Sequence, residues 1–368
     1  MRFFFSAGES SGDVYASELV RRLSSEFPTA LFEGIGGKFS DESGIKLVAN
    51  SSRWGAIGII ESLKRVPTIY SGMLAAKHAL RFGSPGIFVP IDFGYLNVRL
   101  CRLAKQYGWK VVYFIPPGSW NRHKQGRDLP TITDAIITPF SWSRDILAEM
   151  GAKVHYFGHP ILELVDQSHQ EVIRSESTVA LLPGSRLHEI NYTLPAMAAA
   201  CEKLSQIDRI LIPVASTVSD EEIRKLWQRH YHGTAELVLS RDRYWVLRTA
   251  AAAIVCSGTA TLEAALCGCP FAIVYKGSKM MEFEAKIVRP KFDHIGMPNL
   301  ILQERAFPEL IQHEASSEAM ANWLTLLLDP GSEERQAQTQ KMAELRELVK
   351  PDAALTSSAN FIAEFANQ

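Results

Sequence analysis

The stretch FFFSAGESSGDVYASELVRRL, residues 3–23, decides the fold class of the first part of the chain. Residues 2–5 are an apolar run typical of a short buried strand, and residues 14–23 carry apolar side chains at helical spacing. The small-residue turn SAGESSGD, residues 6–13, therefore joins the end of a strand to the start of a helix. Because the first amides of a helix lack partners, such a turn suits an anion or a polar substrate group.

The glycine spacing of this turn separates it from two common nucleotide-binding loops. Gly8 and Gly12 are spaced GxxxG, whereas the dinucleotide fingerprint is GxGxxG. The segment GIGGKFS, residues 34–40, is the nearest imitation of a Walker loop, but it has too few residues before its lysine. A structural alternative stays open, in which the two glycines only permit a tight turn and Asp13 caps the helix.

Short apolar strands alternate with amphipathic helices along the chain. The first set of strands is RFFFSAG, ALFEGIGG, GIFVPID, KVVYFIPP, AIITPF and KVHYFGHP, and the second set is VALLPGSR, DRILIPVA, AELVLS, AAAIVCSG and PFAIVYKG. This alternation predicts an α/β fold with parallel, doubly wound sheets. We expect two Rossmann-like domains, residues 1–165 and 175–350, whose strand ends surround one cleft. A helix in residues 351–368 either crosses back to the first domain or exchanges with a partner in a homodimer.

Composition narrows the class of protein. The 39 Lys and Arg residues balance 40 Asp and Glu residues, so no overall field attracts nucleic acid or a bilayer. The start MRFFFSAGES lacks the long apolar core of a signal peptide, and the five cysteines suggest no paired framework, so we expect a cytoplasmic protein. No apolar run reaches the roughly 18–20 residues that span a membrane. Cys267 and Cys269 lack CxxC spacing, which favours buried thiols over a metal site.

The segment LLPGSRLHEI, residues 181–190, combines a strand end, a glycine turn and a basic residue that opens a helix. Gly184 permits close backbone approach, and Arg186 can bind two oxygens of a diphosphate. The alternative is a surface turn in which Arg186 pairs with Glu189.

The segment SGTATLEAALCGCP, residues 257–270, repeats this logic. Ser257, Gly258 and Thr259 offer hydroxyls and amides at a helix start, and Glu263 can accept hydroxyls of a ribose or sugar. A capping box built on Ser257 or Thr259 is the alternative.

Three more candidates stand at element ends. Asp92, in FVPIDFGYLN, follows a strand and is a candidate general base, although it could instead cap a helix over residues 97–103. His159 could bind a substrate or tie the domain connection together, and Asn299 offers an amide donor and acceptor.

Residues 54–83 combine apolar positions with lysines and arginines. This pattern fits either contact with anionic headgroups at a membrane surface or a core-facing pair of helices divided at Pro67.

Taken together, these stretches resemble the lipid-A-disaccharide synthases, a glycosyltransferase family that joins two acylated glucosamine units. The matching segments are SAGESSGD, WGAIGIIESL, the ID of 91–92, FGHP, LLPGSRLHEI, SGTATLEAAL, VYK and MPNLI, in the family's order over nearly the whole chain.

The resemblance implies a GT-B type fold and an inverting transferase that needs no metal. The implied donor is UDP-2,3-diacylglucosamine and the implied acceptor is 2,3-diacylglucosamine 1-phosphate, with UDP released and a β(1→6) link formed. It also implies work at the cytoplasmic face of the inner membrane.

Individual positions carry over from the family. Asp92 matches its catalytic aspartate, and Arg186 and Asn299 match residues needed for activity or donor binding. The acceptor side is implied for the turn that contains Glu9, Ser11, Gly12 and Asp13. The position of Glu263 matches the acid after the SGT turn.

Two first-domain loops depart from the family pattern. This chain has IDFGYLN at 91–97 where the family commonly reads IDxPDFN, so Tyr95 replaces a second aspartate. It also has PPGSWNRHKQGR at 116–127 where an aromatic-rich loop is usual. These changes leave two alternatives open: a UDP-sugar transferase with another acceptor, and a nucleotide-sugar-binding protein without transfer activity.

Overall fold

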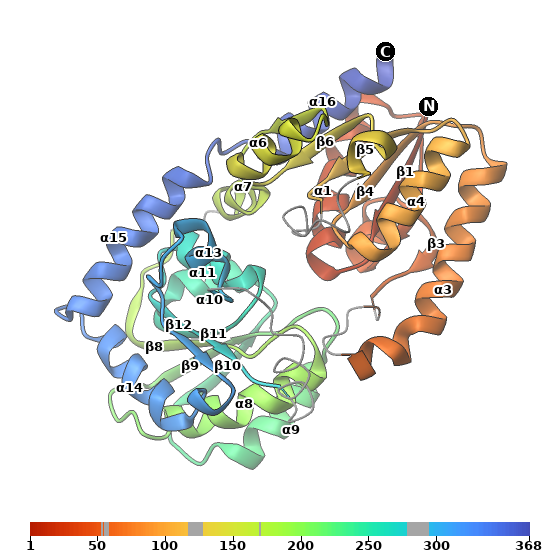
Figure 1. Ribbon diagram of the computed structural model, residues 1–368. Helices are drawn as coiled ribbons and strands as arrows, with labels where there is room; N and C mark the ends of the chain where they lie inside the picture. The colour runs from red at the N-terminus through yellow and green to blue at the C-terminus, as the bar shows by residue number, and fades with distance from the viewer. Residues whose placement is uncertain (53, 55–58, 117–127, 169–170, 278–293) are drawn as a thin grey trace. The chain divides into compact units, whose positions relative to one another are not determined.

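The computed structural model describes residues 1–368 except 53, 55–58, 117–127, 169–170 and 278–293 (Figure 1). The chain forms two compact units. The first contains Met1–Glu163 together with Val349–Gln368, and the second contains Leu164–Leu348.

A seven-stranded parallel sheet forms the centre of the first unit, in the order β3-β2-β1-β4-β5-β6-β7. Its strands are β1 (Arg2–Ala7), β2 (Leu31–Gly36), β3 (Lys46–Asn50), β4 (Ile87–Ile91), β5 (Lys110–Phe114), β6 (Ala135–Thr138) and β7 (Val154–Tyr156). The edge strand β3 was not predicted, because it is short and half-exposed and lacks a continuous apolar run.

Helices cover both faces of this sheet. They are α1 (Ser10–Glu26), α2 (Lys38–Glu42), α3 (Ile59–Phe82), α4 (Gly94–Gln106), α5 (Leu129–Ile132), α6 (Ser141–Glu149), α7 (Pro160–Gln167) and α16 (Ala354–Asn367). Successive side chains of β1 alternate between the faces: Phe4 packs with the cluster under α3 and α4, and Phe3 packs against Phe27 at the end of α1. Burial on both sides explains the run of apolar residues.

Two helix boundaries differ from the predictions. The first helix begins at Ser10 instead of residue 14, with Glu9 as its N-cap residue. The predicted division at Pro67 is wrong, because α3 runs through this residue. Pro67 is exposed, so solvent can satisfy the carbonyl group that the proline leaves without a backbone partner.

The second unit repeats the architecture with a six-stranded parallel sheet in the order β10-β9-β8-β11-β12-β13. Its strands are β8 (Ser175–Leu182), β9 (Arg209–Pro213), β10 (Glu236–Ser240), β11 (Ala250–Cys256), β12 (Phe271–Tyr275) and β13 (Glu309–Ile311). Its helices are α8 (Leu187–Cys201), α9 (Asp220–His230), α10 (Arg243–Thr249), α11 (Thr259–Leu266), α13 (Met297–Leu302), the 3-10 helix η1 (Gln312–Glu314), α14 (Ser317–Leu328) and α15 (Glu333–Leu348).

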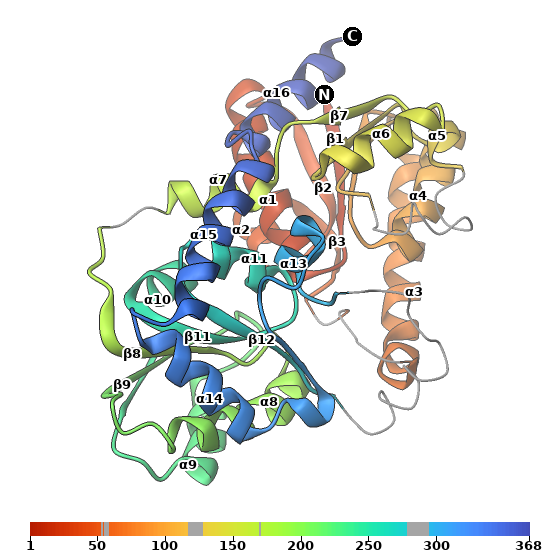
Figure 2. The ribbon, with the colours of Figure 1, turned by 60° about the vertical axis from the view of Figure 1, so that its left-hand side comes forward.

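The end of the chain belongs to the first unit, where α16 packs against α1 (Figure 2). The carboxylate of Glu163 accepts hydrogen bonds from the backbone amides of Leu355 and Thr356, at 2.5 and 3.1 Å, and from the Thr356 hydroxyl at 2.6 Å. It also pairs with Arg22 of α1 at 2.8 Å. One buried acid thus joins α7, α1 and the start of α16.

Candidate active site

Both sheets carry their predicted motifs at the point where the strand order reverses. In the first unit β1 lies beside β4, so the SAGESSGD turn and Asp92 follow neighbouring strands. In the second unit β8 lies beside β11, so the PGSR and SGT turns are neighbours in the same way. Open α/β sheets bind ligands outside the carboxyl ends of strands at such switch points. Each unit therefore presents one candidate half-site.

The half-site of the first unit is built around Asp92. Burial first, and then the nearby charge of Glu9, raise the pKa of its carboxyl to about 6, while the hydrogen bond from the Phe93 amide opposes the rise. A carboxylate with this pKa is a stronger base than an ordinary aspartate and is still largely ionised at neutral pH.

The alternative in which Asp92 caps a helix is wrong. The N-cap position of α4 is Phe93, whose ring cannot accept a hydrogen bond, and the helix begins at Gly94. Asp92 and Phe93 both have left-handed backbone conformations, with φ of 45° and 47°. Two such residues in succession place the carboxyl in a turn that few sequences adopt.

The glycines of the SAGESSGD turn permit close packing. A Cβ atom on Gly8 would lie 2.2 Å from the Phe93 ring, and one on Gly12 would lie 3.4 Å from Ala7 and Ile91. The turn therefore fits closely against the Asp92 turn. Within it, Glu9 and Ser11 are half-buried.

The prediction that Asp13 binds a substrate does not fit the structure. Its carboxylate is 5 % exposed and accepts hydrogen bonds from the amides of Gly37, Phe39 and Ser40, at 2.7, 3.0 and 3.0 Å, and from the Ser40 hydroxyl. The alternative cap on the first helix is also wrong, since Asp13 instead holds the start of α2. The backbone amides of the Walker-like GIGGKFS segment therefore bind a carboxylate of the chain itself, that of Asp13.

The PGSR turn of the second unit also receives an internal carboxylate. Arg186 donates to Glu189 at 2.7 Å, and the amides of Ser185 and Arg186 point at the same carboxylate at 3.1 and 3.3 Å. The pairing of Arg186 with Glu189 that sequence offered as an alternative is thus present. Gly184 has φ +121°, and a Cβ there would meet Glu189 at 2.7 Å. The same amides and guanidinium remain suited to a diphosphate that displaces Glu189.

The SGT turn is open on its glycine side. Gly258 has φ +151°, and no atom lies within 4 Å of a Cβ built there. The capping-box alternative is wrong, because Gly258 is the N-cap residue of α11, which begins at Thr259. The Ser257 hydroxyl instead donates to the Ile295 carbonyl at 2.8 Å.

Glu263 lies one turn into α11 and is 2 % exposed. Its Oε1 lies 3.1 Å from Arg243 and accepts from the Tyr244 hydroxyl at 3.3 Å. Its Oε2 is buried and has no partner among the described residues. Burial first, and then the charge of Glu263, raises the pKa of Tyr244, which keeps this hydroxyl protonated. Arg243 could not be predicted from sequence as a partner of Glu263, because Arg243 follows a different strand of the sheet.

His159 is 3 % exposed, and the structure favours its role in the domain connection over substrate contact. Its amide donates to the Val349 carbonyl at 2.8 Å, and its Nδ1 accepts from the Ile161 amide at 3.2 Å. Burial lowers its pKa to about 3, so the ring is neutral. His159 therefore joins the end of the first sheet to the returning chain.

Asn299 is fully buried, and its amide group is used within the second unit. Its Nδ2 donates to the Phe307 carbonyl and to Glu309, at 2.8 and 2.9 Å, and its Oδ1 accepts from the Phe307 amide at 2.9 Å. Glu309 also accepts from the amides of Ile295 and Gly296. This geometry contradicts direct donor binding by the predicted Asn299 side chain and makes it a support of the loop that begins α13.

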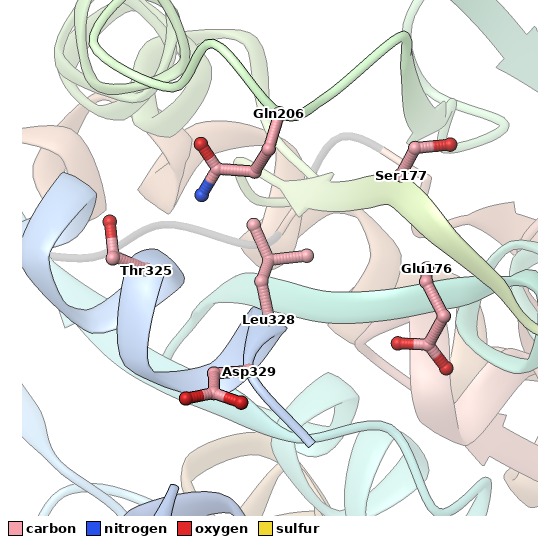
Figure 3. A pocket seen from close by; sticks show the side chains of 6 residues that line it. All are labelled: Glu176, Ser177, Gln206, Thr325, Leu328 and Asp329. Carbon is pink, nitrogen blue, oxygen red and sulfur yellow. The ribbon is translucent and has the colours of Figure 1, made fainter. Parts of the chain in front are cut away.

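One cavity lies away from these turns. It encloses about 540 Å³ at the start of β8 and the end of α14, and Figure 3 shows its lining residues Glu176, Ser177, Gln206, Thr325, Leu328 and Asp329. None of the predicted site residues lines it, and the PGSR turn follows the other end of β8. Among the described residues, no group of three or more His, Cys, Asp or Glu side chains could hold a metal ion.

Solved structures define the class of fold. The chain is similar over 99 % of its length to a UDP-GlcNAc 2-epimerase from Neisseria meningitidis bound to UDP-GlcNAc, with TM-score 0.63, 13 % identity and all of that chain covered. It is similar over 99 % of both chains to MurG of Acinetobacter baumannii, with TM-score 0.58 and 13 % identity. The calicheamicin glycosyltransferase CalG4 matches over 100 % of this chain and 98 % of its own, with TM-score 0.58 and 11 % identity. The predicted GT-B type fold of two Rossmann-like units is confirmed.

Sequence comparison then identifies the family. The family model for lipid-A-disaccharide synthetase matches residues 3–361. A lipid-A-disaccharide synthase of Trichlorobacter lovleyi is 34 % identical over 89 % of this chain and 88 % of its own, and one of Myxococcus xanthus is 29 % identical over 99 % and 97 %. The chain belongs to the lipid-A-disaccharide synthase family of glycosyltransferases, as its motifs predicted.

Proposed function

We propose that this enzyme transfers the sugar of UDP-2,3-diacylglucosamine to the 6-hydroxyl of 2,3-diacylglucosamine 1-phosphate. The observation that carries the proposal is Asp92 at the switch point of the first sheet, with its pKa raised to about 6 by burial and by Glu9. Family membership supports the substrates.

In the proposed step, Asp92 accepts the proton of the acceptor hydroxyl while that oxygen bonds to the anomeric carbon of the donor. The bond from this carbon to the diphosphate breaks, and its electron pair leaves with UDP, which inverts the anomeric centre. A positioned base of this kind contributes roughly 10²–10⁴-fold to a rate. The half-buried Glu9 and Ser11 are the groups of the neighbouring turn that we propose for the acceptor sugar or phosphate.

The second unit supplies the proposed donor half-site. Arg186 and the PGSR amides stabilise the charge that develops on the diphosphate as it leaves, once Glu189 gives up these partners. The buried Oε2 of Glu263, which has no partner among the described residues, suits a ribose hydroxyl, because an unpaired buried acceptor gains from a new donor. No metal is proposed in this step.

The direct test mixes the enzyme with both lipid substrates in detergent and follows UDP release and the lipid product by mass spectrometry. A tetraacyl disaccharide phosphate supports the proposal. In parallel, Asp92→Asn should lower the rate at least about 100-fold and leave the dissociation constant of UDP within about twofold. UDP binding without a disaccharide would instead point to another acceptor or to a binding role, and an active Asp92→Asn variant would overturn the role of Asp92.

We further propose that α3 rests on an anionic membrane surface at the cytoplasmic face. Three exposed apolar side chains, Val66, Tyr70 and Leu74, recur every four residues, at 52 %, 55 % and 47 % exposure. The exposed basic residues Lys77 and Arg81 continue the same helical face. Apolar groups that enter the headgroup boundary beside cations fit a surface-bound helix. No described helix is long and apolar enough to cross a bilayer.

Sedimentation with vesicles tests this contact. The enzyme should bind vesicles that contain phosphatidylglycerol more tightly than neutral phosphatidylcholine vesicles, and added salt should weaken the binding. The double change Tyr70→Ser with Leu74→Ser should reduce it at least about fivefold. Leu300→Ser, which removes an apolar residue that is 43 % exposed in the second unit, is the matched control. Equal binding by both variants would remove α3 as the contact.

A further inference from the structure

The backbone around Asp92 adopts conformations that ordinary residues avoid. Asp92, Phe93 and Ile115 have φ values of 45°, 47° and 53°. Ile115 is β-branched, which makes this conformation especially unfavourable. It directly follows β5, which is paired with β4, and its carbonyl accepts the Asp92 amide at 3.1 Å. Strain of this kind persists only where surrounding groups hold the backbone in place.

Two buried side chains hold the Asp92 carbonyl. The Nδ2 of Asn97 donates to it at 2.8 Å from α4, and the Tyr113 hydroxyl donates to it at 2.9 Å from β5. Both residues are 0 % exposed. Burial raises the pKa of Tyr113 well above its usual value, so its hydroxyl stays protonated and remains a donor.

A third buried residue fixes the orientation of Asn97. The Ser6 hydroxyl of β1 donates to Oδ1 of Asn97 at 2.6 Å, and Nδ2 of Asn97 also donates to the carbonyls of Ser6 and Ile91 at 3.1 Å. Because Oδ1 accepts a hydrogen bond and Nδ2 donates to carbonyls, only one orientation of the Asn97 amide group satisfies these contacts. Ser6 bonds Asn97 directly, and Asn97 and Tyr113 meet at the Asp92 carbonyl, so the three side chains link β1, α4 and β5 through that group.

We propose that Ser6, Asn97 and Tyr113 are positioning residues that fix Asp92 in its left-handed turn and thereby aim its carboxylate at the acceptor hydroxyl. The proposal rests on the proposed function of Asp92 as the base. The Asp92 carbonyl needs one donor and receives two, both from residues that could otherwise be apolar parts of the core. A small displacement of a catalytic group can cost about 100-fold in rate, which makes such support effective.

The test uses Tyr113→Phe, which removes one hydroxyl and keeps the ring in the core. Its matched control is Tyr231→Phe in the second unit, where the hydroxyl accepts from the Ala235 amide at 3.0 Å. Thermal unfolding of both variants identifies any loss of folded protein. Steady-state kinetics with both substrates, from pH 4.5 to 8, then separates kcat from KM.

For Tyr113→Phe we expect kcat to fall about tenfold, with the KM of the donor within about twofold. The midpoint of the rise of kcat with pH should also move, since a displaced carboxylate has another degree of burial and another distance to Glu9. Partial unfolding lowers the plateau without moving this midpoint. Tyr231→Phe should leave both quantities unchanged.

Ser6→Ala provides a second variant, because it loosens Asn97 without touching Asp92 and should act in the same direction with a smaller effect. If Tyr113→Phe and Ser6→Ala both keep kcat within twofold and the midpoint in place, the positioning role is wrong. Asp92→Asn, measured alongside, keeps the two proposals distinct. An active Asp92→Asn variant refutes the base itself, whereas an inactive one beside two active network variants refutes only the network.

Discussion

At the scale of single residues, carboxylates of the chain accept hydrogen bonds from the backbone amides of two glycine-containing turns. Asp13 accepts hydrogen bonds from backbone amides of the GIGGKFS segment, and Glu189 accepts them from the amides of the PGSR turn. The two carboxylates differ in their surroundings. Asp13 is 5 % exposed and binds backbone of another loop, whereas Glu189 lies on the helix that follows its own turn. The proposed donor site requires a substrate diphosphate to replace Glu189, and it requires no displacement of Asp13.

The pKa of Asp92 predicts how the rate depends on pH. Protonated Asp92 cannot accept the acceptor proton, so kcat should fall about tenfold per pH unit below the midpoint near 6. A profile of kcat against pH at saturating substrates measures this fall. A donor with a poorer leaving group should lower kcat, which checks that the chemical step limits the rate. A profile that stays level down to pH 4.5 would contradict the role of Asp92.

The raised pKa of Asp92 also predicts that its ionised carboxylate lowers the free energy of unfolding. Because burial and Glu9 raise the folded pKa of Asp92 from 3.8 to about 6, the folded state holds this proton more tightly than the unfolded state. Its stabilising contribution is therefore present below pH 3.8 and is lost as pH rises through 6, by up to about 3 kcal/mol. Asp92→Asn should unfold at higher urea concentrations than the wild type at pH 7, and the difference should shrink towards pH 4.

Asp13 is expected to matter for stability more than for substrate binding. Asp13→Ala leaves two buried amides and one partly buried amide without their acceptor, which should lower the free energy of unfolding by about 3 kcal/mol. Urea unfolding measures this change. Asp41→Ala, an exposed position on α2, is the control and should change stability by less than about 0.5 kcal/mol. An effect of Asp13→Ala no larger than the control would show that the buried amides find other partners.

At the scale of elements, most of the strands that sequence predicted have continuous apolar runs. Such runs arise because the central strands of a parallel sheet are buried on both faces, as β1 and β4 are. Among the edge strands, β7 and β10 were predicted, whereas β3 and β13 were not. The predicted start of the first helix was shifted, since the polar residues of the SAGESSGD turn already belong to α1.

The positions of Asp92 and of the PGSR and SGT turns at strand ends could be predicted, because apolar strand runs and turn chemistry are local signals. The partners of these residues could not. Tyr113 reads in sequence as one apolar position of β5, and Glu309 is the first residue of the edge strand β13, which sequence did not predict. Their roles depend on which elements become neighbours in three dimensions.

The attachment of α16 gives a prediction at this scale. Glu163 caps the start of α16 and pairs with α1, so Glu163→Ala should release the helix from its place. Limited proteolysis should then cut within residues 350–368 at least about tenfold faster than in the wild type. Glu149→Ala, which changes another glutamate near a helix end of the same unit, should leave the rate unchanged. Unchanged cleavage of Glu163→Ala would mean that apolar packing alone holds α16.

At the scale of the whole molecule, the proposed chemistry is divided between two units of the same architecture. The first supplies a base at the β1/β4 switch point, and the second supplies backbone amides, Arg186 and a buried acid at the β8/β11 switch point. Because both units have the same architecture, each places turns at a switch point of its sheet. The side chains in these turns differ, and so do the roles that we propose for them.

This division predicts transfer without a metal ion. The charge of the leaving diphosphate would be stabilised by the guanidinium of Arg186 and by the amides of Ser185 and Arg186, which serve the purpose that a divalent cation serves in other transferases. We expect the rate in excess EDTA to stay within about twofold of the untreated rate. Arg186→Ala should lose at least about 100-fold in kcat, with Arg224→Ala on the exposed side of α9 as the control. Loss of activity in EDTA with recovery on added Mg²⁺ would show that a cation shares the task and that Arg186 alone does not stabilise the leaving group.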